Sequence, residues 1–299
     1  MNLLGREFDD TFQNHFNQFS SNIDSVVSFY EKVIKWDLAI NRKDFNELIP
    51  VFILRECMEL TDAISILIKN SSVNPASLTL RNLLERSFYL KYMFKGNTAR
   101  KQLCYYYVSE MNKLDFYNSL KIQNTEGKKI LNEDVAEHIS IEPLERQISK
   151  IEQHLKTQKF KEIKDKYREE KKKPRSNEVR WYNLFDGPKS IRSMAKCLNE
   201  MDLYDYVYSQ ISKKIHANEV HEGSIKIVDG QLAIKQIRDP KDMHNVVYLT
   251  MLLSVQIMNI YLDNRIKDKN KKEDLSSYYE SIREFLSNIR NDEYFFSVD

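Results

Sequence analysis

Apolar residues recur every three or four positions along most of this 299-residue chain, which is the spacing of one face of an α-helix. The helices predicted from this pattern span residues 8–36, 45–70, 75–96, 100–121, 241–263 and 275–291. The chain contains only six Gly and six Pro, which favours long helices over a turn-rich β architecture. We therefore expect an all-α protein folded as a multi-helix bundle.

Two segments between the long helices have their own patterns. Residues 181–218 return to the helical spacing and predict two helices that meet near residues 199–203. Residues 224–238 instead alternate apolar and polar side chains around Asp229-Gly230, a dipeptide that favours a tight turn between two strands. We expect one small β-hairpin inserted into the helical fold.

Residues 121–178 are poor in apolar side chains and rich in alternating Lys and Glu. Mixed charge along a helix keeps it solvated, so this stretch predicts an exposed charged helical arm. Glu169 and Glu170 interrupt the basic run that ends near Pro174, which favours a solvated arm over an RNA-binding patch. A partner protein is the other ligand that this arm could recruit.

These elements divide the chain into consecutive parts. We expect an N-terminal helix packed on the core (1–40), the first half of a helical core (41–120), the arm (121–178), the second half of the core (179–265) and a C-terminal helix (272–299). The net charge of +2 excludes a strong global field that would draw the protein onto nucleic acid or anionic lipid.

The sequence predicts a cytoplasmic protein that does not enter a membrane. Its three separated cysteines suit a reducing compartment, and no apolar run follows a basic segment at the start. The most apolar stretch, residues 246–262, is interrupted by Ser254, Gln256 and Asn259 and is short for a membrane span. We interpret it as a buried helix.

The first candidate site is a charged group on an apolar helix. Arg81 and Glu85 are four residues apart and share a helix face that leucines surround, and Arg86 follows directly. Burying such a pair costs desolvation energy. The pair is either an internal salt bridge that fixes helix packing, the reading we favour, or part of a pocket in which Arg81 binds phosphate and Glu85 orients a histidine.

The second candidate site is a polar stripe in which Tyr204, Tyr208, Ser212 and His216 follow one another at spacings of four. Imidazole titrates near pH ~6.5, so His216 could act as a general acid or base, or equally be a hydrogen-bonded core residue. His221 lies just beyond. Two histidines and one uncertain carboxylate are too few ligands for a metal site, and we expect no metal and no cofactor.

The third candidate is Arg238 with His244, separated by five residues where a helix is predicted to begin. Helical ribonucleases of the HEPN superfamily, which need no metal, carry an Arg followed four to six residues later by a His. About one such spacing is expected by chance in a chain with this many Arg and His residues, so the motif is weak evidence.

The segments RNLLERSFYLKYMF and WYNLFDGPKSIRSMAKCLNEMDLYDYVYSQISKKIHANEVHEG, with a variable basic insert between them, resemble the bacterial and archaeal domain-of-unknown-function family numbered 5677. The resemblance covers about residues 48–260. Its recognisable elements correspond to Arg81, Glu85, Trp181, Tyr208, Ser212 and His216. The resemblance implies an intracellular bacterial helical protein and no established reaction. A distant relation to HEPN proteins would set Ser212 where their catalytic Arg stands.

Two hypotheses follow. In the first, the protein is a toxin-like or antiviral ribonuclease that binds RNA, with His216 as the base, Arg81 or Arg238 stabilising charge and Tyr208 and Ser212 beside them. Arg86, His221 and His244 would then contact the substrate, and a homodimer could complete the site. In the second, the protein is a non-catalytic regulatory module with a polar pocket for an anionic ligand or a protein partner. Both require Arg81, Glu85 and His216 to meet in space.

Overall fold

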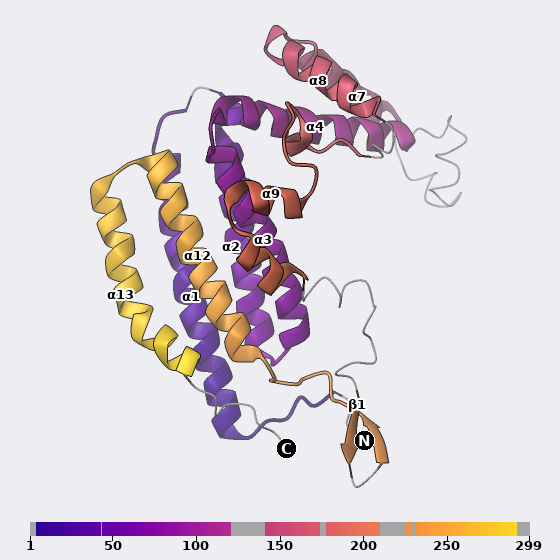
Figure 1. Cartoon of the computed structure of the whole chain (residues 1–299). Coiled ribbons are helices and arrows are strands. Elements are labelled where there is room, and N and C mark those ends of the chain that lie inside the picture. The colour runs from indigo at the N-terminus through magenta and orange to yellow at the C-terminus, as the bar shows by residue number, and fades with distance from the viewer. Residues whose placement is uncertain are drawn as a thin grey trace. The chain divides into compact units, whose positions relative to one another are not determined.

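The computed structural model describes residues 4–42, 44–120, 141–173, 178–209, 225–228 and 231–291. The chain forms two compact units. Unit 1 comprises residues 1–43, 50–95 and 191–299, and unit 2 comprises residues 44–49 and 96–190. Helices dominate both units in the described residues, which confirms the prediction of an all-α helical protein (Figure 1).

Unit 1 is a bundle of long helices. They are α1 (Asp10–Leu38), α2 (Ile49–Lys69), α3 (Val73–Phe94), α12 (Met243–Tyr261) and α13 (Lys269–Asn291). Helix α12 packs against α1, α3 and α13, so apolar side chains from opposite ends of the sequence share one core (Figure 1). Burial of these apolar faces is the main source of stability for helices of this kind.

Helix α12 is the most apolar of the bundle. Together with the π-helical turn η5 (Leu262–Ile266) it is long and apolar enough to cross a membrane, and it alone meets that test among the described residues. In the structure 56% of its most apolar window is buried against the rest of the protein. A buried bundle helix accounts for the same composition.

Of the two helices predicted to meet near residues 199–203, the structure describes the first and the start of the second, and residues 210–218 lie outside the described residues. Helix α9 (Ile191–Leu198) packs on α3 and ends at Asn199, whose φ of +59° is the left-handed conformation that terminates helices. A single turn, α10 (Met201–Leu203), then leads into the π-helical segment η4 (Tyr204–Ser209). The predicted hairpin also forms, because β1 (Ile225–Val228) pairs antiparallel with β2 (Gln231–Ile234) around residues 229–230.

Helix α13 begins earlier than the apolar pattern predicts, within the charged stretch before Leu275. Asp268 explains this start because its carboxylate accepts hydrogen bonds from the backbone N–H groups of Asn270 and Lys271. These bonds lower the pKa of Asp268 and satisfy donors that a helix N-terminus leaves free. The charged residues after it are good helix formers and need no apolar face.

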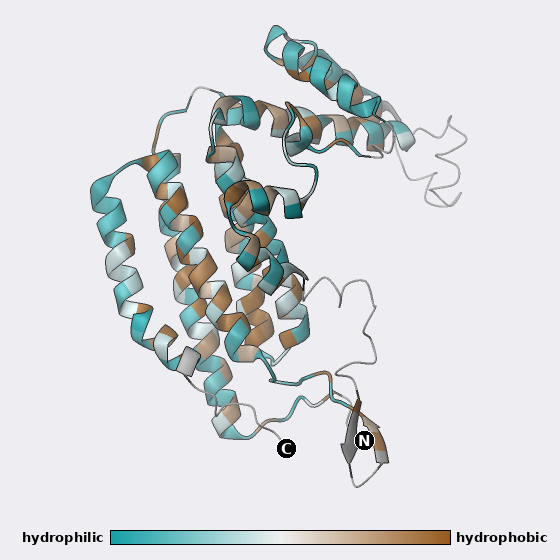
Figure 2. Ribbon diagram, viewed as in Figure 1, coloured by the Kyte–Doolittle hydropathy of each residue, from teal (hydrophilic) through white to brown (hydrophobic). Residues whose placement is uncertain are grey.

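Unit 2 is built around α4 (Thr98–Ser119). Packed on it are η1 (Phe45–Leu48), α7 (Ile141–Leu155), α8 (Lys161–Lys171) and η3 (Trp181–Asn183), with η2 (Gln158–Phe160) joining α7 to α8. In the segment predicted as a charged arm, the described residues 141–173 form two amphipathic helices whose outward faces are hydrophilic (Figure 2). Their inner faces bury Ile148, Ile151, Ile163 and Tyr167, and Phe160 of η2 is also buried, so only one side of these helices is solvated.

A buried ion cluster lies at one end of the unit 1 bundle. Asp37, in the last turn of α1, is fully buried and forms ion pairs with Arg42 and with Arg265, whose Nε lies 3.3 Å from the carboxylate. The Tyr261 hydroxyl donates to the second carboxylate oxygen over 3.1 Å. Both oxygens of Asp37 therefore have partners, which a carboxylate removed from water requires.

Candidate functional site

Arg81 and Glu85 form the ion pair that their spacing predicts. On α3, Arg81 Nη2 lies 3.3 Å from Glu85 Oε1, and each side chain is only 16% exposed. The leucines around them, Leu80, Leu83 and Leu84, are buried in the bundle. The same apolar face that folds α3 into the core thus carries this charged pair into a half-buried position, where its interaction is stronger than at the surface.

Tyr208 joins this pair from a segment 127 residues further along the chain. Arg81 Nη2 donates a hydrogen bond to the Tyr208 hydroxyl, and the guanidinium carbon lies 4.1 Å from the centre of the Tyr208 ring. Burial raises the pKa of Tyr208, and the Glu85 carboxylate raises it further while Arg81 opposes the shift. The phenol is therefore protonated at neutral pH and serves as a hydrogen-bonding group.

Two contacts of α3 set the position of Tyr208. Lys91 Nζ donates to Glu200 Oε1 over 2.7 Å, and Lys95 Nζ donates to the carbonyl oxygen of Cys197. They fasten the end of α9 and the start of α10 to α3 directly before η4. Tyr204 then stacks on Tyr208 with ring centres 4.7 Å apart, as the spacing of four predicts.

The remaining residues of the predicted stripe, Ser212 and His216, lie outside the described residues, as does His221. The described structure therefore brings together Arg81, Glu85 and Tyr208, which we call the Arg81 cluster. The segment η4 that carries Tyr208 is a π-helix, a form found frequently at functional sites.

The Arg81 cluster has an unused hydrogen-bond donor. Arg81 Nε is buried and makes no hydrogen bond to any part of the chain that the structure describes. A buried donor without an acceptor costs about 1–3 kcal/mol. An anionic oxygen placed there would remove this cost, and a guanidinium can bind phosphate through two parallel N–H donors.

Arg86 has a different partner. Its Nε lies 2.5 Å from Glu56 Oε2 on α2, and its guanidinium carbon is 5.4 Å from the centre of the Tyr89 ring. This pair is more exposed than that of Arg81, at 31% and 41% for the two side chains. Arg86 thus links α3 to α2.

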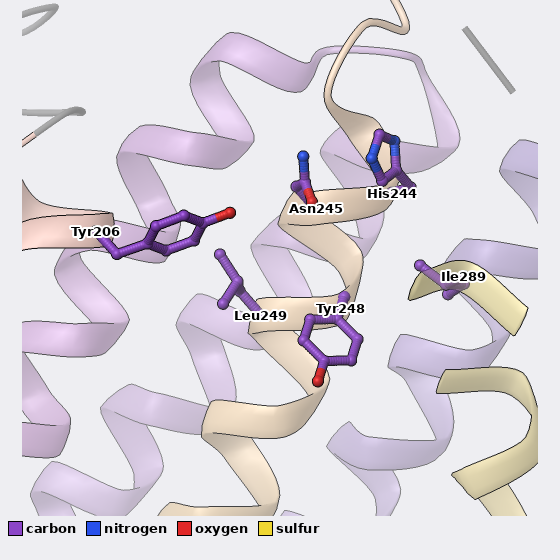
Figure 3. A pocket seen from close by; sticks show the side chains of 6 residues that line it. All are labelled: Tyr206, His244, Asn245, Tyr248, Leu249 and Ile289. Atoms are coloured by element: carbon purple, nitrogen blue, oxygen red, sulfur yellow. The ribbon is translucent and has the colours of Figure 1, made fainter. Parts of the chain in front are cut away.

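His244 lines a pocket of about 360 Å³ at the start of α12 (Figure 3). The other lining residues are Tyr206, Asn245, Tyr248, Leu249 and Ile289. Tyr206 belongs to η4, is 61% exposed and points its hydroxyl toward the α12 side of the pocket (Figure 3). The sequence contains no local signal for Tyr206, Asn245 or Tyr248, since the pocket forms only when η4 and α12 come together.

Arg238 does not line the pocket of His244. It lines another pocket of about 410 Å³, formed with residues from the N-terminal segment and the end of α2. The Arg238 and His244 motif is therefore divided between two cavities. Among the residues that the structure describes, no three His, Cys, Asp or Glu side chains are grouped so that they could hold a metal ion.

Comparison with known proteins gives a family and no activity. No curated protein and no solved structure matches the chain. A family model described as a family of unknown function, DUF5677, matches residues 47–224. This range begins where the sequence resemblance predicts but ends at residue 224, before the predicted end near residue 260, and it includes Arg81, Glu85 and Tyr208. Because the match spans more than half of the 299 residues, the chain belongs to the family of unknown function DUF5677.

Proposed function

We propose that this protein is a metal-independent ribonuclease of the HEPN type, with the Arg81 cluster as part of its active centre. The observation that carries the proposal is the half-buried Arg81, which has an unsatisfied Nε donor and lies against Tyr208. Tyr208 begins the segment Tyr-x3-Ser-x3-His, which leads to His216 eight residues later. Arg81, as the group that binds phosphate, and His216, as the general base, would then lie in neighbouring parts of one active centre.

The proposed reaction uses RNA's own 2′-hydroxyl as the nucleophile. His216 removes the hydroxyl proton, the 2′-oxygen attacks the adjacent phosphorus, and the bond to the 5′-oxygen breaks as that oxygen takes a proton from water, which leaves a 2′,3′-cyclic phosphate and a 5′-hydroxyl. Arg81 stabilises the negative charge that develops on the phosphorane oxygens. Glu85 orients the imidazole, and Tyr208 holds the guanidinium in place through its hydroxyl and ring.

Cleavage of a single-stranded RNA in EDTA tests this proposal. We expect His216→Ala to lower the rate roughly 10²–10⁴-fold, the usual contribution of a general base. Arg81→Lys keeps the charge but removes the planar fork, and we expect a loss of roughly 10²–10³-fold. Arg55→Lys is the matched control, because Arg55 pairs with Glu59 at the same spacing but is 60% exposed.

Several results of this cleavage assay would contradict the proposal. Cleavage that is absent from the wild-type protein, or equal in His216→Ala, rejects the mechanism. Equal losses in Arg81→Lys and Arg55→Lys would show that the buried guanidinium has no special role. A chelator-sensitive rate would point to metal chemistry and also contradict the proposal.

A specific observation supports a second candidate function, a non-catalytic binding module. Glu85 already compensates the charge of Arg81, so the cluster can act as a fixed polar pocket without any reaction. A ligand that binds the native state raises the melting temperature. A thermal-shift screen with anionic small molecules, combined with no RNA cleavage, would favour this module, and a flat screen would favour a protein partner.

A further inference from the structure

Three basic side chains from separate segments surround one cavity of unit 1. Arg6, Lys69 and Arg238 line this pocket of about 410 Å³ together with Phe8, Gln13 and Asn70. We call it the Arg238 pocket. Its volume falls in the range that small-molecule sites occupy, roughly 300–1,000 Å³. None of the lining residues that the structure describes is Asp or Glu.

The three cations of the Arg238 pocket form no ion pair with any residue that the structure describes. The nearby Lys235, in contrast, lies 3.9 Å from Asp239. Like charges gathered around one cavity repel one another. An anion that enters the cavity would relieve that repulsion.

Two carboxylates close in sequence to these cations have other partners. Asp9, three residues after Arg6, caps α1 by accepting the backbone N–H of Phe12 over 2.9 Å. Asp239, next to Arg238, accepts the backbone N–H of Lys241 and lies 3.9 Å from Lys235. Glu7, next to Arg6, is exposed and is not among the residues that line the pocket.

The N-terminal segment lies close to the segment that follows β2. Gly5 has a φ of +52°, and a Cβ at that position would lie 2.5 Å from the Gln236 side chain. Glycine supplies the positive φ and lets the N-terminal backbone lie against this side chain. Figure 1 shows the N-terminal segment beside the hairpin region, and this contact brings Arg6 and Arg238 to the same cavity.

The composition of the pocket indicates the class of ligand. Three cations favour a ligand with more than one negative charge, and a single phosphate group already carries about −1.5 to −2 at neutral pH. Phe8 is half-buried against Phe16, with ring centres 4.9 Å apart, and offers an apolar edge, while Gln13 and Asn70 supply amides. An extended nucleic acid would require a basic stripe, whereas the chain's net charge is only +2.

We propose that the Arg238 pocket binds a small phosphorylated ligand of the nucleoside diphosphate class. Titration calorimetry with ADP, inorganic pyrophosphate and adenosine, at fixed ionic strength and without magnesium, tests this assignment. ADP and pyrophosphate should bind, and adenosine should not. Each charged hydrogen bond lost should weaken binding roughly tenfold or more, so Arg238→Gln and Lys69→Gln should both bind ADP at least that much more weakly.

Lys35→Gln is the control, because Lys35 is an exposed cation of α1 that pairs with Glu31 away from this pocket. It should bind ADP as the wild-type protein does. Lys69 is exposed, so Lys69→Gln keeps the test valid even if Arg238→Gln destabilises the fold.

Several results would overturn the assignment. ADP that does not bind, or that binds both pocket variants with wild-type affinity, would refute it. Loss of ADP binding in Arg81→Gln alone would place the ligand at the Arg81 cluster instead. Single-stranded RNA that binds more tightly than ADP and depends on Lys69 and Arg238 would identify a nucleic-acid surface rather than a small-molecule site.

Discussion

Replacing Asp37 by Asn should cause one of the largest losses of stability that a single isosteric change can produce in unit 1. The substitution keeps the volume of the side chain but removes the negative charge that pairs with both Arg42 and Arg265, which are 17% and 9% exposed. Removing one partner of a buried ion pair costs about 3–5 kcal/mol. Because both arginines keep some access to water, we expect about 3 kcal/mol.

Urea unfolding followed by Trp36 fluorescence measures this loss. Trp36 precedes Asp37 on α1, and a Trp181→Phe background leaves it as the only tryptophan, so the signal reports on unit 1. With an m-value of about 2–3 kcal/mol/M, a loss of about 3 kcal/mol lowers the midpoint by about 1–1.5 M urea.

Glu31→Gln is the matched control for Asp37→Asn. It makes the same change from acid to amide on the same helix, but Glu31 and its partner Lys35 are 58% and 70% exposed. An exposed pair contributes only about 0–1 kcal/mol. If Asp37→Asn moved the midpoint no further than Glu31→Gln, the Asp37 cluster would not stabilise the bundle and the reasoning from burial would fail.

Three further predictions concern both units. Phe160→Ala should destabilise unit 2 by about 3–5 kcal/mol in a thermal or urea melt, because Phe160 is fully buried beside Tyr106; a loss below 1 kcal/mol would contradict that packing. A thiol reagent at pH 8 should modify one cysteine per native chain, the exposed Cys197, and three after denaturation; modification of two or three native thiols would refute the burial of the others. Burial and Asp115 raise the pKa of Tyr167 to about 12, so the phenol ionises more easily when unfolded. The stability of unit 2 should thus be complete below pH 10 and fall between pH 10 and 12, and Tyr167→Phe should flatten that decline.

The sequence predicts local features well because they depend on neighbouring residues. The three-to-four spacing of apolar residues places the long helices within a few residues of their observed bounds. The turn residues Asp229-Gly230 likewise predict the strand pairing in which Val228 lies opposite Gln231. Helix ends that depend on capping, such as the start of α13 after Asp268, are predicted less well, because a capping hydrogen bond does not change the spacing of apolar residues.

Features that depend on residues distant in the chain are not predicted by the sequence, although one of them, the buried Asp37 cluster, leaves a signal in it. The buried stripe of α1 contains Val26, Tyr30 and Val33, and Asp37 falls on the same face at the next helical spacing. A carboxylate on an apolar stripe indicates a buried partner, but the sequence does not say that Arg42 and Arg265 supply it. The Arg238 pocket gave no comparable signal, because its basic residues come from three separate segments.

The Arg81 cluster shows what a local motif can and cannot establish. The chain contains the Arg-x3-Glu spacing at both Arg55–Glu59 and Arg81–Glu85, and both form ion pairs. The first pair is 60% and 52% exposed and the second is 16% and 16% exposed, so only the second bears a large desolvation cost. The leucines beside Arg81 predict this difference, whereas the contact with Tyr208 needs the fold. If the second pair is retained for function, Arg81→Lys should impair RNA cleavage more than it lowers the melting temperature, relative to Arg55→Lys. If it only fixes packing, stability alone should fall.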